Sequence, residues 1–168
     1  SDCQTEPGFA CFKTKGGEGS TCAELLPVVH MAPTSSFHSG QCGLTVDAAC
    51  TKLADAFKHA HDGSTVLVHP GRYDFLTVAS TVLNSRNVTL VGQGGPSVTI
   101  FYDDSATMRG EVNAIHLKKV TNLRIEGITF TGFATVPLEV EDSSTIEIVN
   151  CHFLHNRVSI SLQSAYVM

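Results

Sequence analysis

Acidic residues are the first candidates for chemistry in this chain, because a glycoside hydrolase needs two carboxylates about 5 to 9.5 Å apart. Asp103 and Asp104 form a tempting pair within an expected loop. No second acidic motif in the sequence accompanies them. We therefore interpret the pair as a solvated turn.

A polysaccharide lyase would instead need an acidic cluster that binds calcium, with an Arg or Lys that removes a proton from the sugar. The acidic candidates are Glu126, Glu139, Glu141, Asp142 and Glu147. Strand-like alternation points Glu139, Glu141 and Glu147 outward, which favours an ordinary solvated face over a metal site. Arg157 could meet an acidic sugar, but a turn arginine is the simpler interpretation.

Eight histidines raise the question of a metal site. His59 and His61 lack the four-residue spacing of a helical zinc motif. His152 and His155 are expected to flank a corner between strands. We assign these histidines structural or surface roles, and the sequence predicts no catalytic residue, no metal ion and no cofactor.

The cysteines indicate an oxidising compartment. Five of the six occur within the first fifty residues, which is typical of a segment held by disulfides, and the fifteen ways of pairing them stay open. The disulfide candidates are Cys3, Cys11, Cys22, Cys42, Cys50 and Cys151. Cys151 matches the inward position of Ile128 one repeat earlier, so we prefer to interpret it as a small buried hydrophobic residue. Asn87 begins the sequon Asn-Val-Thr and is the candidate N-glycosylation site, which agrees with a secreted glycoprotein.

Composition narrows the class of protein further. The chain has 168 residues, 42% of them hydrophobic and 16% charged, and a net charge of -5. These values predict one globular domain and disfavour a nucleic-acid partner, which would require clustered positive charge. The apolar runs are far shorter than the roughly 20 residues of a membrane-spanning helix, so no membrane span is expected.

Two segments precede the regular part of the chain. Residues 1–43 are rich in Gly, Ser, Thr, Pro and Cys, and we expect a Cys-rich, irregular N-terminal arm. Apolar residues then recur at spacings of three and four, which predicts a helix over 45–61 that Thr45 caps. Thr65–Val68 follows as a predicted strand. Residues 44–168 would form one structural unit.

The second half of the chain contains an internal repeat. Residues 122–130 align with residues 145–153 at an offset of 23, so that Leu123 and Ile125 match Ile146 and Ile148. A second series repeats at nearly the same offset, and its matched positions are Ile115 and Leu117, Leu138 and Val140, and Ile160 and Leu162. Period-two alternation with a repeat of this length predicts one coil of three strands per repeat.

We therefore predict an all-β fold, a parallel β-helix of about four to five coils with an N-terminal capping helix. A β-sandwich would give a similar composition, but it has no reason to keep a 23-residue phase. It would also use Asn-Gly or Asp-Gly hairpin turns, and the sequence has an Asp-Gly only where the helix is expected to end.

The chain resembles the N-terminal part of proteins with the pectin-lyase-like right-handed parallel β-helix. The likeness covers about residues 44–168 and rests on the expected helix, the segment Asp62–Tyr73, and the coils around Asn87, Asn122 and Thr145. The resemblance implies a fold and not a reaction, because this fold serves lyases, hydrolases, epimerases, adhesins and surface fibres. The Asn-Thr-Asp, Gly-His-Gly and Arg-Ile-Lys signatures of the family's hydrolases are absent from the sequence.

Two functions remain open from the sequence. The first is a secreted, extracellular structural protein that self-associates, with β-helix ends meeting head to tail in a filament. The candidate residues at the assembling end are Ile160, Leu162, Tyr166 and Val167. The alternative is the N-terminal portion of a carbohydrate-active β-helix enzyme, with carbohydrate as its partner. The absence of a catalytic signature favours the structural protein.

Overall fold

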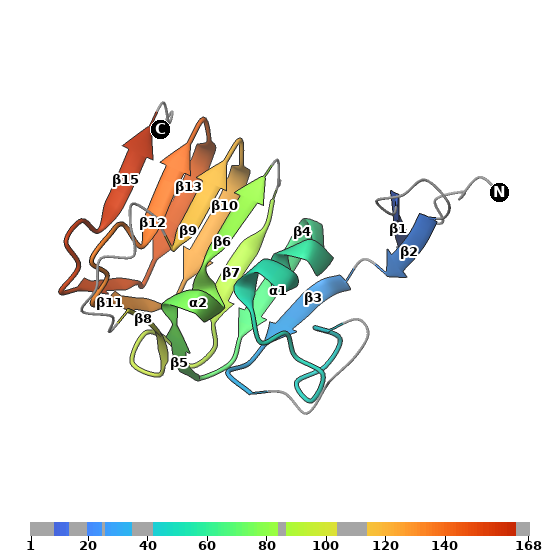
Figure 1. Ribbon diagram of the computed structural model, residues 1–168, viewed down its shortest axis with the longest axis horizontal. Helices are drawn as coiled ribbons and strands as arrows, with labels where there is room; N and C mark the ends of the chain where they lie inside the picture. The colour runs from blue at the N-terminus through green and yellow to red at the C-terminus, as the bar shows by residue number, and fades with distance from the viewer. Residues whose placement is uncertain are drawn as a thin grey trace.

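A computed structural model describes residues 9–13, 20–24, 26–34, 42–83, 87–103 and 114–163 (Figure 1). Most of this chain is β-strand, arranged as three parallel sheets. Two short helices, α1 (Leu53–His59) and α2 (Phe75–Val78), interrupt the strands. A separate antiparallel hairpin consists of β1 (Phe9–Lys13) and β2 (Ser20–Glu24), and it lies apart from the three sheets in Figure 1.

From β4 onward, successive strands of the chain join sheet 1, sheet 2 and sheet 3 in turn, and this order then repeats. Sheet 1 has the order β13-β10-β7-β4-β3 and contains β3 (Leu26–Met31), β4 (Ala60–Val68), β7 (Thr89–Gly92), β10 (Thr121–Glu126) and β13 (Ser144–Val149). Sheet 2 has the order β14-β11-β8-β5 and contains β5 (Gly71–Asp74), β8 (Thr99–Tyr102), β11 (Thr129–Thr131) and β14 (His152–Leu154). Sheet 3 has the order β15-β12-β9-β6 and contains β6 (Ser80–Leu83), β9 (Ile115–Lys118), β12 (Leu138–Glu141) and β15 (Ile160–Gln163).

Three consecutive strands, one from each sheet, make a unit that we call a strand triplet. Every triplet lies beside the next one along the chain, as the green-to-red order of the strands shows in Figure 1. This arrangement confirms the predicted all-β, parallel β-helix-like fold. The predicted register is also confirmed, because Leu123 pairs with Ile146 and Leu138 pairs with both Ile115 and Ile160.

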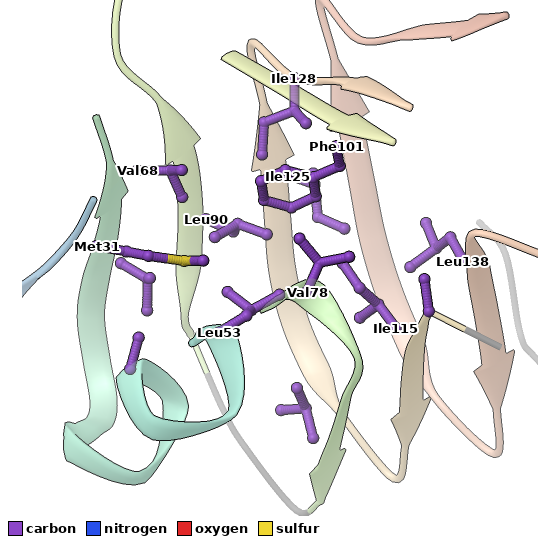
Figure 2. Packing of buried hydrophobic residues seen from close by; sticks show 14 of the residues in the cluster. Met31, Leu53, Val68, Val78, Leu90, Phe101, Ile115, Ile125, Ile128 and Leu138 are labelled. Atoms are coloured by element: carbon purple, nitrogen blue, oxygen red, sulfur yellow. The ribbon is translucent and has the colours of Figure 1, made fainter. Parts of the chain in front are cut away.

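Alternation within the strands creates the core. In β10, the side chains of Leu123 and Ile125 are buried, while those of Arg124 and Glu126 lie on the outer side of sheet 1. Equivalent inward residues of successive strands stack into columns, since parallel strands are about 4.8 Å apart. Figure 2 shows side chains from all three sheets, together with Leu53 of α1, meeting in the enclosed space.

Sheet 2 contributes an aromatic column to this core. Tyr73, Phe101, Phe130 and Phe153 are paired in register on β5, β8, β11 and β14. Their ring centroids are 5.5, 5.5 and 5.0 Å apart in sequence order, within the range for favourable aromatic pairs. The Tyr73 hydroxyl donates a hydrogen bond to the carbonyl oxygen of His69 at 2.7 Å, so its polar end is satisfied inside the core.

The predicted helix over 45–61 is wrong at both ends, because α1 has only seven residues. Thr45 does not cap it: its Oγ1 accepts a hydrogen bond from the Ala48 amide at 3.3 Å within a preceding turn, and α1 begins after Lys52. Cys50 instead forms a parallel bridge with Met31. Pairing with the sheet edge thus takes these residues out of the helix.

The expectation of an irregular segment throughout residues 1–43 is also wrong, because β1, β2 and β3 all lie within it. Leu26–Met31 forms β3, which pairs in parallel with β4 and places Val29 and Met31 in the core. Pro27 is accommodated where the register of β3 shifts between Leu26 and Val28. Sheet 1 therefore begins well before the expected helix.

Candidate functional site

Helix α1 packs against the first strands of the sheets. Leu53 and Ala56 of this helix are fully buried, and α1 packs against β3, β4 and β6. Figure 2 shows Leu53 pointing into the core beside Met31 and Val78. The first inward side chains of the sheets are therefore shielded from solvent.

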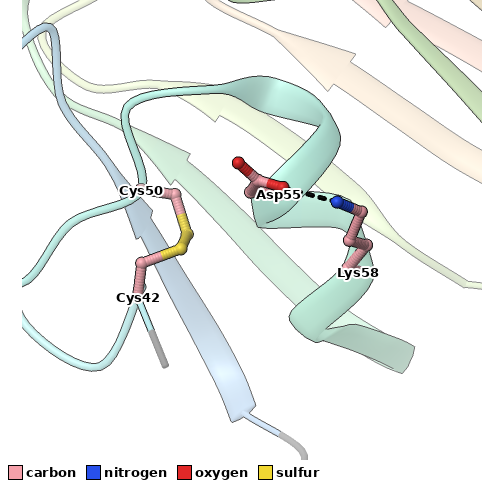
Figure 3. The surroundings of a disulfide bond; sticks show 4 residues. All are labelled: Cys42, Cys50, Asp55 and Lys58. Carbon is pink, nitrogen blue, oxygen red and sulfur yellow. Dashed lines mark hydrogen bonds and ion pairs between the residues drawn. A yellow bond between two sulfur atoms is a disulfide. The ribbon is translucent and has the colours of Figure 1, made fainter. Parts of the chain in front are cut away.

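The outer edge of β3 is covered as well, by a loop over residues 42–50. A disulfide between Cys42 and Cys50 closes this loop beside β3 (Figure 3), with Cα atoms 4.9 Å apart. The His30 amide donates to the Gly43 carbonyl at 2.8 Å, and the His30 carbonyl accepts from the Cys50 amide at 2.8 Å. The edge of sheet 1 thus has hydrogen-bond partners at this end.

The C-terminal end differs. Within the part of the chain that the structure describes, β13, β14 and β15 each form the edge of their sheet with no further strand beyond them. The inward positions of this last triplet are only partly buried, whereas those of the preceding triplet are closed. In sheet 3, Leu162 exposes 56% of its surface, and Val140 directly behind it exposes 1%.

We call this surface the open end and define it by the apolar residues of the last triplet that solvent reaches. The inward-facing members are Ile146, Ile148, Cys151, Phe153, Ile160 and Leu162, and two exposed neighbours complete the surface, Leu154 on the outer side of β14 and Val158 in the loop before β15. Ile160 and Leu162 were predicted from the sequence, while Tyr166 and Val167 lie outside the described residues. The other members were missed, although the 23-residue offset identifies most of them as counterparts of buried positions.

The outer face of sheet 3 carries a charged cluster. His116 lies 3.1 Å from Glu141 and 3.6 Å from Glu139, and Lys118 donates a hydrogen bond to Glu141. Bonding to Lys118 and His116 holds the pKa of Glu141 below its usual value, and the same carboxylate raises the pKa of Lys118. Glu139 also accepts a hydrogen bond from Gln163. The predicted outward orientation of Glu139 and Glu141 is confirmed by their burial pattern.

The outer face of sheet 1 holds a depression of about 210 Å³. It is lined by Asn122, Leu123, Arg124, Thr145 and Glu147. The Arg124 guanidinium is held by Glu126 at 2.9 Å and by Glu147 at 2.8 Å, and these carboxylates raise its pKa. The positive charge of Arg124 is therefore balanced by two carboxylates, so little of it remains to attract an acidic sugar.

A short asparagine ladder runs beside this depression. Asn122 donates a side-chain hydrogen bond to Asn87 at 2.9 Å, and both residues have positive φ angles of 56° and 54°. Thr145 follows in the next strand at φ 56°, where a β-branched residue is strained. Asn87 is exposed, and the ladder uses its oxygen and not the nitrogen that would carry a glycan.

The other residues considered as catalytic or metal-binding candidates do not come together in one site among the described residues. Asp103, directly after β8, is buried, so the expected solvated turn is wrong for this residue, and Asp104 lies outside the described residues. His152 and His155 are exposed on and after β14. No group of three or more metal-ligating side chains occurs in the described ranges. Arg157 is exposed.

The remaining cysteines fall into three cases. Cys151 is a free thiol in the open end, and burial raises its pKa. Cys11 and Cys22 are opposite each other in the register of β1 and β2. Cys3 lies outside the described residues.

Comparison with known proteins gives no relative. No family model matches the chain, and no curated protein and no solved structure is significantly similar to it. Among the described residues, no helix is both long and apolar enough to cross a membrane. The resemblance to the pectin-lyase-like family therefore stays a prediction.

Proposed function

We propose that this protein is an extracellular structural protein that self-associates through the open end. The observation that carries the proposal is a contrast in burial along each column of inward side chains. The side chain of the third triplet is buried, and the equivalent side chain of the last triplet is partly or largely exposed. Fully burying a Leu, Ile, Val or Phe side chain contributes about 1.5–3 kcal/mol. Several partly exposed side chains on one surface thus favour contact with another chain.

The finer description of the fold belongs to the same proposal. We infer a right-handed β-helix, because parallel crossover connections are right-handed in about 98% of cases. Four strand triplets and the additional strand β3 agree with four to five coils. The packing of α1 supports its role as the N-terminal cap, and the pectin-lyase-like family remains the fold family we propose.

The partner that fits the open end best is a second open end. Exposed strand edges offer unpaired amide and carbonyl groups to another strand. At the opposite end of the stack, α1 and the loop over residues 42–50 already cover the core and the edge of β3. This asymmetry favours a twofold contact between two C-terminal ends over the head-to-tail filament expected from the sequence, since a twofold contact uses the same surface on both copies.

Secretion is supported by the Cys42–Cys50 disulfide, because disulfides persist in oxidising compartments.

Directly opposed residues of antiparallel strands have Cα atoms about 4.5–5.5 Å apart, within the range for disulfides. We therefore propose Cys11–Cys22 as a second disulfide. Peptide mapping without reduction should find both disulfides and a free Cys151 thiol. If Asn87 carries a glycan, treatment with a glycosidase should lower the mass of the protein, and replacing Asn87 should abolish that change.

The experiment that tests the function is analytical ultracentrifugation of the wild type and two variants over a range of concentrations. Leu162→Lys places a charge in the open end. Leu44→Lys is the matched control, because Leu44 is similarly exposed, at 47%, but lies in the disulfide-closed loop. We expect association in the wild type and in Leu44→Lys and its loss in Leu162→Lys. A wild type that stays monomeric at every concentration would refute the proposal.

A further inference from the structure

Two histidines that are far apart in the sequence meet beside the disulfide-closed loop. His30 lies in β3, and His69 directly follows β4. Nδ1 of His30 is 3.0 Å from Nε2 of His69, the ring planes are 17° apart, and the ring centroids are 5.2 Å apart. Both side chains are partly exposed, so solvent reaches the pair.

The backbones of both histidines are fixed. The amide and carbonyl groups of His30 bond to Gly43 and Cys50 in the loop over residues 42–50, each at 2.8 Å. The carbonyl oxygen of His69 accepts the hydrogen bond of the Tyr73 hydroxyl, which is anchored in the aromatic column. Two imidazoles on a rigid frame lose little conformational entropy when a third group binds between them.

We propose that His30 and His69 form a binding site for a late first-row divalent cation, such as Zn²⁺ or Cu²⁺. Imidazole nitrogens suit these ions, and Cu²⁺ binds a given nitrogen site more tightly than Zn²⁺. The site is independent of the proposed assembly, because it lies at the covered N-terminal end and not at the open end.

The spacing of the two nitrogens is close to that of two ligands of one ion. Two nitrogen ligands of a tetrahedral ion are roughly 3.3 Å apart when each metal–nitrogen bond is about 2.0–2.1 Å. Binding would replace the hydrogen bond between these nitrogens, which are 3.0 Å apart, by two metal–nitrogen bonds, with a few tenths of an ångström more separation and a rotation of the rings toward the ion. The ligating tautomers carry their protons on Nε2 of His30 and Nδ1 of His69, so both rings bind as neutral imidazoles.

Both ligands must be neutral to bind the ion. A neutral imidazole can bind a metal, whereas a protonated one cannot. Because no third ligating side chain completes the group within the described residues, water would occupy the other coordination positions.

Calorimetric titration of the untagged, metal-free protein with Zn²⁺ and with Cu²⁺ tests the proposal. We expect one site per chain and tighter binding of Cu²⁺. His30→Gln and His69→Gln should each weaken binding at least about tenfold, since loss of even an outer-shell partner costs 10–100-fold. His152→Gln is the control, because His152 is exposed on β14 and should leave the affinity unchanged.

A second measurement on the wild type keeps the test independent of how the variants fold. Cu²⁺ is paramagnetic, and it should broaden the imidazole NMR signals of His30 and His69 before those of His152 and His155. Reduction of Cys42–Cys50 should weaken binding, since the loop fixes His30. Equal broadening of all four histidines, or an affinity unchanged in both glutamine variants, would overturn the proposal.

Discussion

The two ends of the stack show how the same inward columns behave with and without a cover. At the N-terminal end, α1 buries Leu53 and Ala56 against the first strands, and the disulfide-closed loop satisfies the edge of β3. At the C-terminal end, the columns stop at the partly exposed side chains of the open end. Under the proposed function, the last triplet needs a partner to cover these side chains, whereas the inward side chains of the first strands are already buried.

The largest expected effect compares two phenylalanines of the aromatic column. Phe130→Ala should cost about 3–5 kcal/mol of unfolding free energy, because Phe130 is fully buried and the change leaves a cavity. Phe153→Ala should cost less than half as much in dilute protein, where no second chain covers its partly exposed ring. Urea denaturation at low concentration measures both variants.

Raising the concentration sharpens this comparison, because the cost of Phe153→Ala should grow as the open end becomes covered. If Phe130→Ala does not fold, Ile125→Val and Ile148→Val repeat the test within sheet 1 at a cost of about 0.5–1.5 kcal/mol for the buried residue. Equal losses in dilute protein at the buried and the exposed positions would contradict the proposed difference between the ends.

The next effect concerns the cover of the N-terminal end. Removing the disulfide with Cys42→Ser and Cys50→Ser together should lower the unfolding free energy by about 2–3 kcal/mol, the chain-entropy value for a short loop. Thermal unfolding under nonreducing conditions measures the loss. Cys151→Ser should lose much less, because Cys151 is a free, partly buried thiol. A double variant as stable as the wild type would show that the loop holds without its bond.

A smaller effect tests the asparagine ladder, which the last triplet interrupts. Thr145→Asn should raise the unfolding free energy by about 1 kcal/mol, because a left-handed conformation costs roughly 1–2 kcal/mol in most residues and Asn tolerates it. The reciprocal change Asn122→Thr should destabilise by a similar amount. Chemical denaturation of the two variants measures these changes in unfolding free energy. A loss of stability in Thr145→Asn would show that other contacts of Thr145 compensate for its strain.

The smallest effect is a pH dependence at the outer face of sheet 3, between the two ends. The folded pKa of Glu141 is lowered from its usual 4.5 by Lys118 and His116. Its contribution to stability is therefore present above that usual value and is lost as the pH falls through the lowered one. Wild type and Glu141→Gln should differ slightly at neutral pH and converge in acid. A difference that persists at the lowest pH would exclude this origin.

The central part of the stack could be predicted because its repeat is regular. Ile146 and Ile148 follow Leu123 and Ile125 at a constant offset. The register of the two strands comes from that offset, and the inward orientation of these side chains comes from the alternation within each strand. The earlier strands break that phase, and the loops between them differ in length. The aromatic column could therefore be recognised at Phe130 and Phe153 but not back to Phe101 and Tyr73.

The disulfide-closed loop and the histidine pair could not be predicted in the same way. The apolar spacing around Cys50 suits a helix, but a bridge to Met31 and a disulfide to Cys42 override it through contacts distant in sequence. His30 and His69 are 39 positions apart and meet only because β3 pairs with β4. No local spacing in the sequence could have joined them.

Hydrogen–deuterium exchange at low and high protein concentration tests most directly whether the open end is an assembly surface. The amides of β14 and β15 should exchange quickly in dilute protein and gain protection as the concentration rises, while those of β11 and β12 should be protected throughout. Exchange in β14 and β15 that is independent of concentration, or protection that appears at α1 instead, would contradict association between C-terminal ends.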